Sequence, residues 1–81
     1  MNTKEKLLAI INKVLPLDDY VGSDHVFSQK YGISATPMVY ILLEWRKEYQ
    51  LEISDEFVDA MEHCTFARLE ELLERYSGIA A

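Results

Sequence analysis

The chain has 81 residues, of which 49% are hydrophobic and 27% are charged. This length predicts one small domain over residues 1–81, and the composition predicts a folded chain. The formal charge of −6 argues against nucleic-acid binding, which needs Lys and Arg to displace counterions from phosphates. The single cysteine, Cys64, excludes an internal disulfide, so we expect a reducing, cytoplasmic compartment. No membrane contact is expected, because the longest apolar run, residues 38–43, is too short to span a bilayer.

The negative charge is concentrated near the end of the chain. Residues 1–51 hold six acidic and six basic side chains, whereas residues 52–81 hold eight acidic and two basic ones. A solvated helical surface would explain this excess. An acidic docking surface for a basic partner is the less favoured alternative, and it stays open.

The first half of the chain predicts one helix and one long connection. Apolar residues recur on a single helical stripe over Thr3–Leu15, and Pro16 ends that helix. The stretch 17–35 holds turn-forming residues and has no sustained period. We therefore expect a long ordered loop with a helical turn near residues 24–29.

The second half predicts three helices. Thr36 would supply the N-cap oxygen of the second helix, followed by Pro37, and the apolar spacing carries that helix to about Gln50. Ser54 starts a short third helix, and Thr65 caps the last helix. The last helix is expected to end at the pair 77–78, Ser-Gly. The predicted fold class is therefore all-α, a four-helix bundle with a long first loop and a short third helix.

This layout resembles an acyl carrier protein, and three segments support the resemblance. Residues 24–32 look like the carrier loop in which an aromatic residue precedes a Leu-Gly pair. Residues 52–56, Glu-Ile-Ser-Asp-Glu, look like the Glu-Ile-Pro-Asp-Glu that leads into the family's third helix. Residues 64–66, Cys-Thr-Phe, look like the Thr-Val start of its last helix, reached about two residues late. The resemblance covers nearly the whole chain and implies the acyl-carrier-protein fold.

The resemblance also implies where a prosthetic group would be attached. In carrier proteins an Asp-Ser-Leu follows the loop glycine, and its serine hydroxyl receives 4′-phosphopantetheine. Counting from Gly32 places Ala35 at that serine position. Alanine has no nucleophile, so we expect no prosthetic group and no cofactor. The alternative is a working carrier that bears 4′-phosphopantetheine on a displaced serine, Ser34 or, less readily, Ser28. Ser34 is disfavoured because adjacent positions at a helix start point about 100° apart.

The resemblance further implies a role in binding rather than catalysis. The family's second helix is acidic, whereas here Arg46 and Lys47 replace acids at matched positions and reduce its charge. The chain is similar to carrier-related proteins of peptide-maturation systems that lack the attachment serine. The predicted function is therefore a non-enzymatic scaffold without a prosthetic group for a protein or peptide partner, in peptide modification or another specialised biosynthetic cluster.

The predicted partner surface lies around the start of the second helix, from Ile33 through Tyr40, and extends onto the third helix at Phe57. The small residues Ser34 and Ala35 at the start of this helix would let a partner approach closely. Methionine and aromatic side chains would supply contact area. The residues assigned to this surface are Ile33, Met38, Tyr40 and Phe57. Trp45 follows the apolar stripe of the second helix, which favours the core, although an interface role stays open.

Enzymatic activity and metal binding find no support in the sequence. His25, His63 and Cys64 lack the paired spacing and the ligand number of a structural zinc site. A catalytic cysteine would need a base placed beside its thiol, and a sequence neighbour need not face it.

Overall fold

The computed structural model describes residues 2–77. It contains four helices: α1 (Thr3–Ile11), α2 (Ala35–Tyr49), α3 (Asp55–Glu62) and α4 (Phe66–Tyr76). The described residues form no β-strand and only two isolated bridges, His25 with Thr65 and Leu51 with Ser77. The predictions of an all-helical chain, a long first connection and a short third helix are confirmed.

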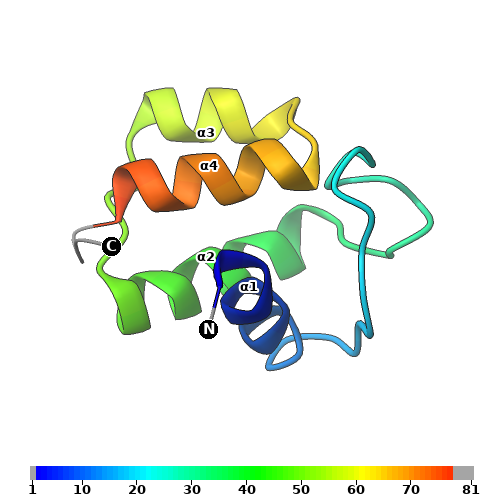
Figure 1. Ribbon diagram of the computed structural model, residues 1–81. Helices are drawn as coiled ribbons and strands as arrows, with labels where there is room; N and C mark the ends of the chain where they lie inside the picture. The colour runs from blue at the N-terminus through cyan, green and yellow to red at the C-terminus, as the bar shows by residue number, and fades with distance from the viewer. Residues whose placement is uncertain (1, 78–81) are drawn as a thin grey trace.

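The helices pack as two pairs that are joined through α1. α3 and α4 run side by side, and α1 packs against both α2 and α4 (Figure 1). The connection of residues 12–34 passes around one end of the helices and returns to the start of α2. No Cα atom of α2 lies within 8 Å of a Cα atom of α3 or α4, so α2 reaches those helices through side chains alone.

Two helix starts match their predicted caps. The Ser54 hydroxyl oxygen accepts a hydrogen bond from the Phe57 N–H at 3.2 Å, at the start of α3. The Thr65 hydroxyl oxygen accepts one from the Arg68 N–H at 3.3 Å, at the start of α4. Each cap satisfies a backbone N–H that has no partner within its own helix. The predicted end of α4 is met at Ser77, whereas Gly78 lies outside the described residues.

The start of α2 differs from the prediction by two residues. Ser34, not Thr36, is the N-cap, and Ala35 is the first helical residue. Pro37 is therefore the third helical residue, still within the first turn, where its missing N–H costs no intrahelical bond. The helix ends at Tyr49, close to the expected Gln50.

Helix α1 ends at Ile11, four residues before the predicted Leu15. The cause is the side-chain amide of Asn12, which donates to the carbonyl oxygens of Leu8 at 2.8 Å and Leu17 at 2.7 Å. The Leu17 N–H in turn donates to the Asn12 side-chain oxygen at 3.1 Å. A side chain that bonds nearby backbone competes with helix propagation, so Asn12 ends the helix before Pro16 is reached.

The long connection is ordered because its backbone bonds to the start of α4. The Asp24 carbonyl accepts from the Phe66 N–H at 3.0 Å, and the Gly22 carbonyl accepts from the Ala67 N–H at 2.9 Å. These bonds satisfy first-turn donors of α4. Where a helical turn was predicted, near residues 24–29, the chain forms non-helical turns, one of them closed by the Ser28 N–H donating to the His25 carbonyl at 3.0 Å.

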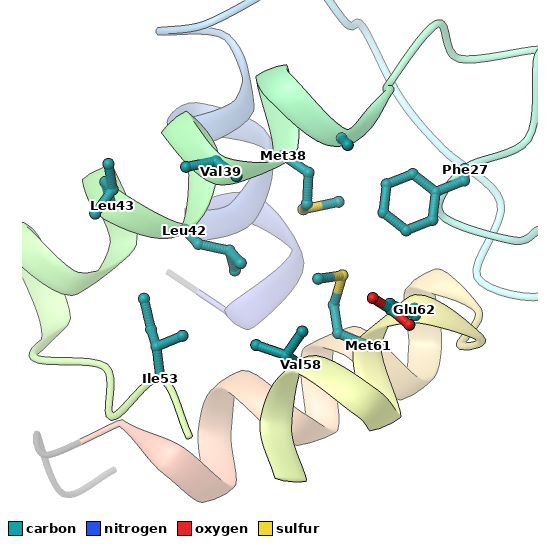
Figure 2. Close-up of a pocket in the computed structure, with 10 residues that line it drawn as sticks. Phe27, Met38, Val39, Leu42, Leu43, Ile53, Val58, Met61 and Glu62 are labelled. Atoms are coloured by element: carbon teal, nitrogen blue, oxygen red, sulfur yellow. The ribbon is translucent and has the colours of Figure 1, made fainter. Parts of the chain in front are cut away.

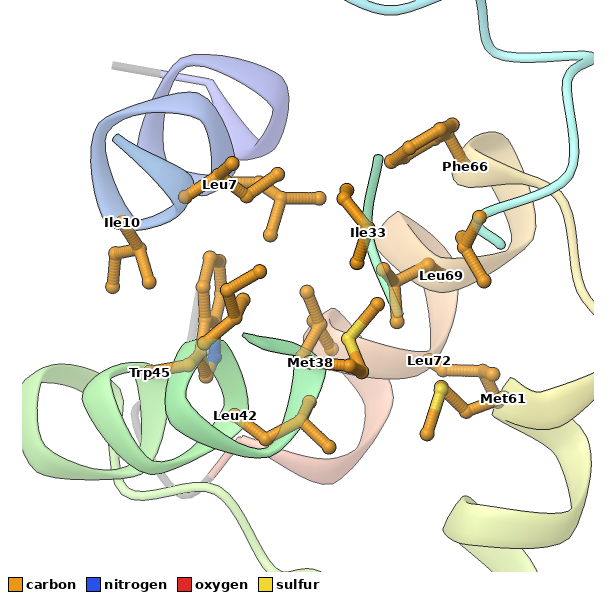
Figure 3. Packing of buried hydrophobic residues seen from close by; sticks show 14 of the residues in the cluster. Leu7, Ile10, Ile33, Met38, Leu42, Trp45, Met61, Phe66, Leu69 and Leu72 are labelled. Carbon is orange, nitrogen blue, oxygen red and sulfur yellow. The ribbon is translucent and has the colours of Figure 1, made fainter. Parts of the chain in front are cut away.

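The core is built by all four helices and by the long connection. Figure 3 shows buried side chains of α1, α2, α3 and α4 converging on one interior, with Ile33 of the connection among them. Trp45 is 3% exposed and its indole N–H donates to the Ser77 hydroxyl at 2.9 Å. Trp45 is therefore a core residue, which settles the alternative that the sequence left open.

Candidate functional site

An apolar groove separates α2 from α3. Its volume is about 250 Å³, and it opens to the surface on one side. Figure 2 shows the α2 side chains on one wall and the α3 side chains on the other. The groove is lined by Phe27, Ala35, Met38, Val39, Leu42, Leu43, Ile53, Val58, Met61 and Glu62.

The α2 wall exists because the apolar stripe of this helix is wider than the core requires. Met38 and Leu42 are buried, whereas Val39 and Leu43, one position further along, are 53% and 45% exposed. A helix that packs on one side needs an apolar stripe about 100° wide. Val39 and Leu43 extend the apolar stripe of α2 beyond the part that is buried in the core, and they form the outer rim of the groove.

The α3 side of the groove supplies a methionine at the floor and a carboxylate at the edge. Met61 is buried and lies across the groove from Met38, so two methionine side chains meet at the floor (Figure 2). Val58 is partly buried, and Glu62 lines the groove with an exposed side chain. Methionine is unbranched and adapts its shape to different contacts, so this floor can adjust to a bound group.

Ala35 and Ser34 open onto two neighbouring depressions, which share Phe27 as a lining residue. Ala35 is exposed and lines the groove between α2 and α3. Ser34 is also exposed, but it lines a second, shallower depression on the side of the connection, together with Ser28 and Gly32. A group attached to Ser34 would therefore begin in a different depression from a group attached at Ala35.

The residues predicted to contact a partner separate into exposed and buried ones. Tyr40 is 56% exposed, as expected from its position off the apolar stripe. Ile33, Met38 and Phe57 are 3%, 2% and 0% exposed, so they present almost no surface of their own, and their assignment to a partner contact stays a prediction. Phe57 lies on the inner side of α3, where its ring meets that of Tyr76 edge-on at 5.7 Å. Among the buried three, Met38 still reaches the groove, at its floor.

Three exposed apolar residues line the groove. Leu43 and Ile53 lie outside the predicted partner surface, and Val39 lies within its range 33–40 but was not singled out. Val39 and Leu43 are four residues apart on α2, which places them on one helical face. That spacing was visible in the sequence. It could not be assigned, because a wide apolar stripe is equally expected for a helix buried on both sides.

The Cys64 thiol is held in its protonated form by its surroundings. Burial raises the pKa of the Cys64 thiol to about 11, and its Sγ–H donates to the Met61 carbonyl at 3.1 Å. A thiol with this pKa stays protonated near neutral pH and is a poor nucleophile. Within residues 2–77, no group of three or more His, Cys, Asp or Glu side chains is placed to hold a metal ion.

Among the described helices, none combines the length and the apolar character needed to cross a membrane. Comparisons of the chain with protein-family models, with curated proteins and with solved structures gave no significant match. The resemblance to acyl carrier proteins therefore rests on the residues of this chain and on its helical layout.

Proposed function

We propose that this protein is a non-enzymatic, acyl-carrier-like interaction protein that works without a prosthetic group and binds a protein or peptide partner at the groove between α2 and α3. The observation that carries the proposal is the place of Ala35. It is exposed at the groove, at the position where the resemblance puts the modified serine, and it has no hydroxyl to modify.

Exposed apolar side chains support a binding role for this groove. Five large hydrophobic side chains are exposed in the described part of the chain, and three of them, Val39, Leu43 and Ile53, line the groove. A fourth, Tyr40, follows Val39 on α2. Exposed apolar side chains gathered at one site are typical of contact surfaces, whereas scattered ones need no explanation. The resemblance places such binding in peptide modification or another specialised biosynthetic pathway, in the cytoplasm.

The alternative function is a working carrier that bears 4′-phosphopantetheine on Ser34. One observation favours it: Ser34 is exposed, and its side chain makes no cap hydrogen bond at the start of α2. A second observation is less favourable, because Ser34 lines the depression beside the connection rather than the groove. The arm of an attached cofactor would have to pass Phe27, which lines both depressions, to reach the apolar walls of the groove.

Intact mass separates the two functions. The purified chain is incubated with coenzyme A and a broad-specificity phosphopantetheinyl transferase, with an ordinary carrier protein as the positive control. We expect the carrier to gain one cofactor mass and this chain to gain none. A gain that disappears in Ser34→Ala would establish the alternative and overturn the proposal. The same result with Ser28→Ala would place the attachment in the connection.

A further inference from the structure

We infer that the occupant of the groove is a cationic amphipathic segment of the partner, with apolar side chains between α2 and α3 and with Lys or Arg side chains along α3. This inference rests on the proposed function and names the chemistry of the partner. Two independent features of the site lead to it, the apolar walls and the charge beside them.

The apolar walls select the buried half of the partner segment. The floor and both sides of the groove are aliphatic, aromatic or thioether groups, apart from Glu62 at the α3 edge (Figure 2). Val39 and Leu43 stand at the outer rim with about half of their surface exposed. Covering such surface contributes about 25 cal/mol per Å² of apolar area. A polar segment would gain nothing from these walls.

The negative charge on α3 beside the groove favours cationic side chains on the opposite face of the partner segment. Asp55, Asp59 and Glu62 are spaced four and three residues apart on α3. At 100° per residue they fall within about 60° of one another, so they form a single acidic ridge. Val58, which lines the groove, is about 40° from Glu62 around the same helix. Glu62 therefore lies at the α3 edge of the groove, and Asp55 and Asp59, about 60° and 100° from Val58, continue the ridge on the outer side of that edge.

The acidic ridge lacks counter-charges within the described chain. All three carboxylates are exposed, and none forms an ion pair with a Lys or Arg side chain among residues 2–77. Like charges four residues apart on a helix repel each other. A cationic segment lying along α3 would relieve this repulsion while its apolar face fills the groove, which is electrostatic complementarity of the kind that selects partners.

Other occupants fit the charge less well. A fatty acid or another anionic amphiphile would bring its negative headgroup towards a site whose α3 edge is already negative. A second copy of this chain would bring a further −6 charge, which opposes self-association. Arg46 and Lys47 lie in the last turn of α2, so cationic side chains of the partner are expected to follow α3 rather than that end of α2.

Synthetic peptides test the inference directly. The probes are a labelled amphipathic Leu/Lys peptide of about 18 residues, long enough to form a helix on the surface, its Leu/Glu counterpart, and a Leu/Lys peptide of scrambled order. Affinity for the full chain is measured by fluorescence anisotropy at about 0.15 M salt, where exposed charges further apart than about 8 Å are screened. We expect the amphipathic Leu/Lys peptide to bind about tenfold more tightly than either other peptide.

Variants of the chain locate the binding. Leu43→Gln and the shape-conserving Val39→Thr each make the rim polar, and each should weaken the Leu/Lys peptide by about three- to tenfold. Asp59→Asn combined with Glu62→Gln should weaken it by about two- to tenfold. The matched control is Glu5→Gln combined with Asp18→Asn, which removes the same charge at exposed positions outside the groove lining and should leave affinity unchanged. Circular dichroism confirms that each variant is folded.

The contrary results are distinct for the two proposals. Equal affinity for the Leu/Lys and Leu/Glu peptides, weakened by the rim variants, would overturn the cationic partner and retain the groove as the binding site. Equal weakening by the control and ridge variants would mean that net charge alone attracts the peptide, and would also overturn the inference. Binding that ignores both rim variants would remove the groove from the proposed function itself. Absence of binding by all three peptides would overturn the inference, whereas the mass test separately decides whether the chain carries a prosthetic group.

Discussion

The two sides of α2 and α4 differ in how completely they are covered. On the side of α1 and the long connection, Phe66 is fully buried and its ring stacks on Tyr20 at a centroid distance of 4.2 Å. On the side of α3, the apolar stripe of α2 is wider than the surface that other elements cover, so Val39 and Leu43 stay in contact with solvent. On the covered side the rings of Phe66, Tyr20 and Tyr31 pack closely within the core. The uncovered side carries apolar surface that the fold does not need for burial, and this surplus is what favours a binding role.

Truncation on the covered side should have the largest effect. Phe66→Ala removes a ring that packs face-on against Tyr20 and edge-on against Tyr31, at 4.2 and 5.0 Å. We expect the free energy of unfolding in urea to fall by about 3–5 kcal/mol, because a closed cavity is left in the core. A loss below that of the groove-side truncation described next would mean that the two sides do not differ in packing.

Truncation at the boundary of the two sides should cost less. Leu42 is 6% exposed and also lines the groove. Leu42→Ala should lower the free energy of unfolding by about 2–3 kcal/mol, the lower part of the usual range, because the space it leaves opens into the groove instead of forming an enclosed cavity. The same urea titration measures it. A loss as large as that of Phe66→Ala would show that the groove is closed in solution.

Truncation on the exposed side should affect binding and not stability. Tyr40 is 56% exposed. Tyr40→Ala should weaken the amphipathic Leu/Lys peptide by about 1–2 kcal/mol, the loss of a modest contact residue, and should leave the urea midpoint almost unchanged. If Tyr40→Ala proves as destabilising as Leu42→Ala while affinity stays constant, the assignment of the α2 faces is wrong. The docking surface would then have to be sought on α4.

The smallest effect concerns the pH dependence of the covered side. The Tyr31 hydroxyl donates to the Asp24 carboxylate, and this bond, aided by Lys30 at 3.3 Å, lowers the pKa of Asp24 from its ordinary 3.8. A lowered folded-state pKa stabilises the fold above the unfolded value, and this contribution is lost as the pH falls through the folded value. Tyr31→Phe should therefore give a shallower decline of unfolding free energy below about pH 5. The measured quantity is the slope of the unfolding free energy against pH. The absolute stability is not used, because Tyr31→Phe also removes the acceptor of the Val21 N–H. An unchanged slope would contradict the assignment.

The fold was predictable where a local signal sufficed. Ser54 and Thr65 cap their helices within three residues of themselves, so their effect can be read from neighbours in the sequence. The end of α1 was missed because Asn12 acts by bonding the carbonyl of Leu17, and that bond exists only once the chain has turned. The start of α2 was placed two residues late, because Thr36 is also a cap-forming residue and is followed by Pro37, which is common at the first helical position.

The candidate site was less predictable than the fold. Tyr40 was expected to be exposed because it falls off the apolar stripe, and this is confirmed. Met38 and Phe57 were predicted to contact a partner, but both are buried. The spacing of apolar residues shows which side of a helix is apolar, and it does not show how much of that side is covered. Which part of the stripe is covered depends on the distance between α2 and α3, and no residue within either helix encodes that distance.

The separation of α3 from α2 has a consequence for induced fit. Among the helices, α4 alone has Cα atoms within 8 Å of α3, and α3 is only eight residues long. A change in the tilt of α3 would change the width of the groove, while the contacts of α1 with α2 and α4 stay in place. A partner with a larger apolar side chain can therefore be accommodated by moving one short helix, and selectivity for the size of that side chain should be weak compared with selectivity for its charge.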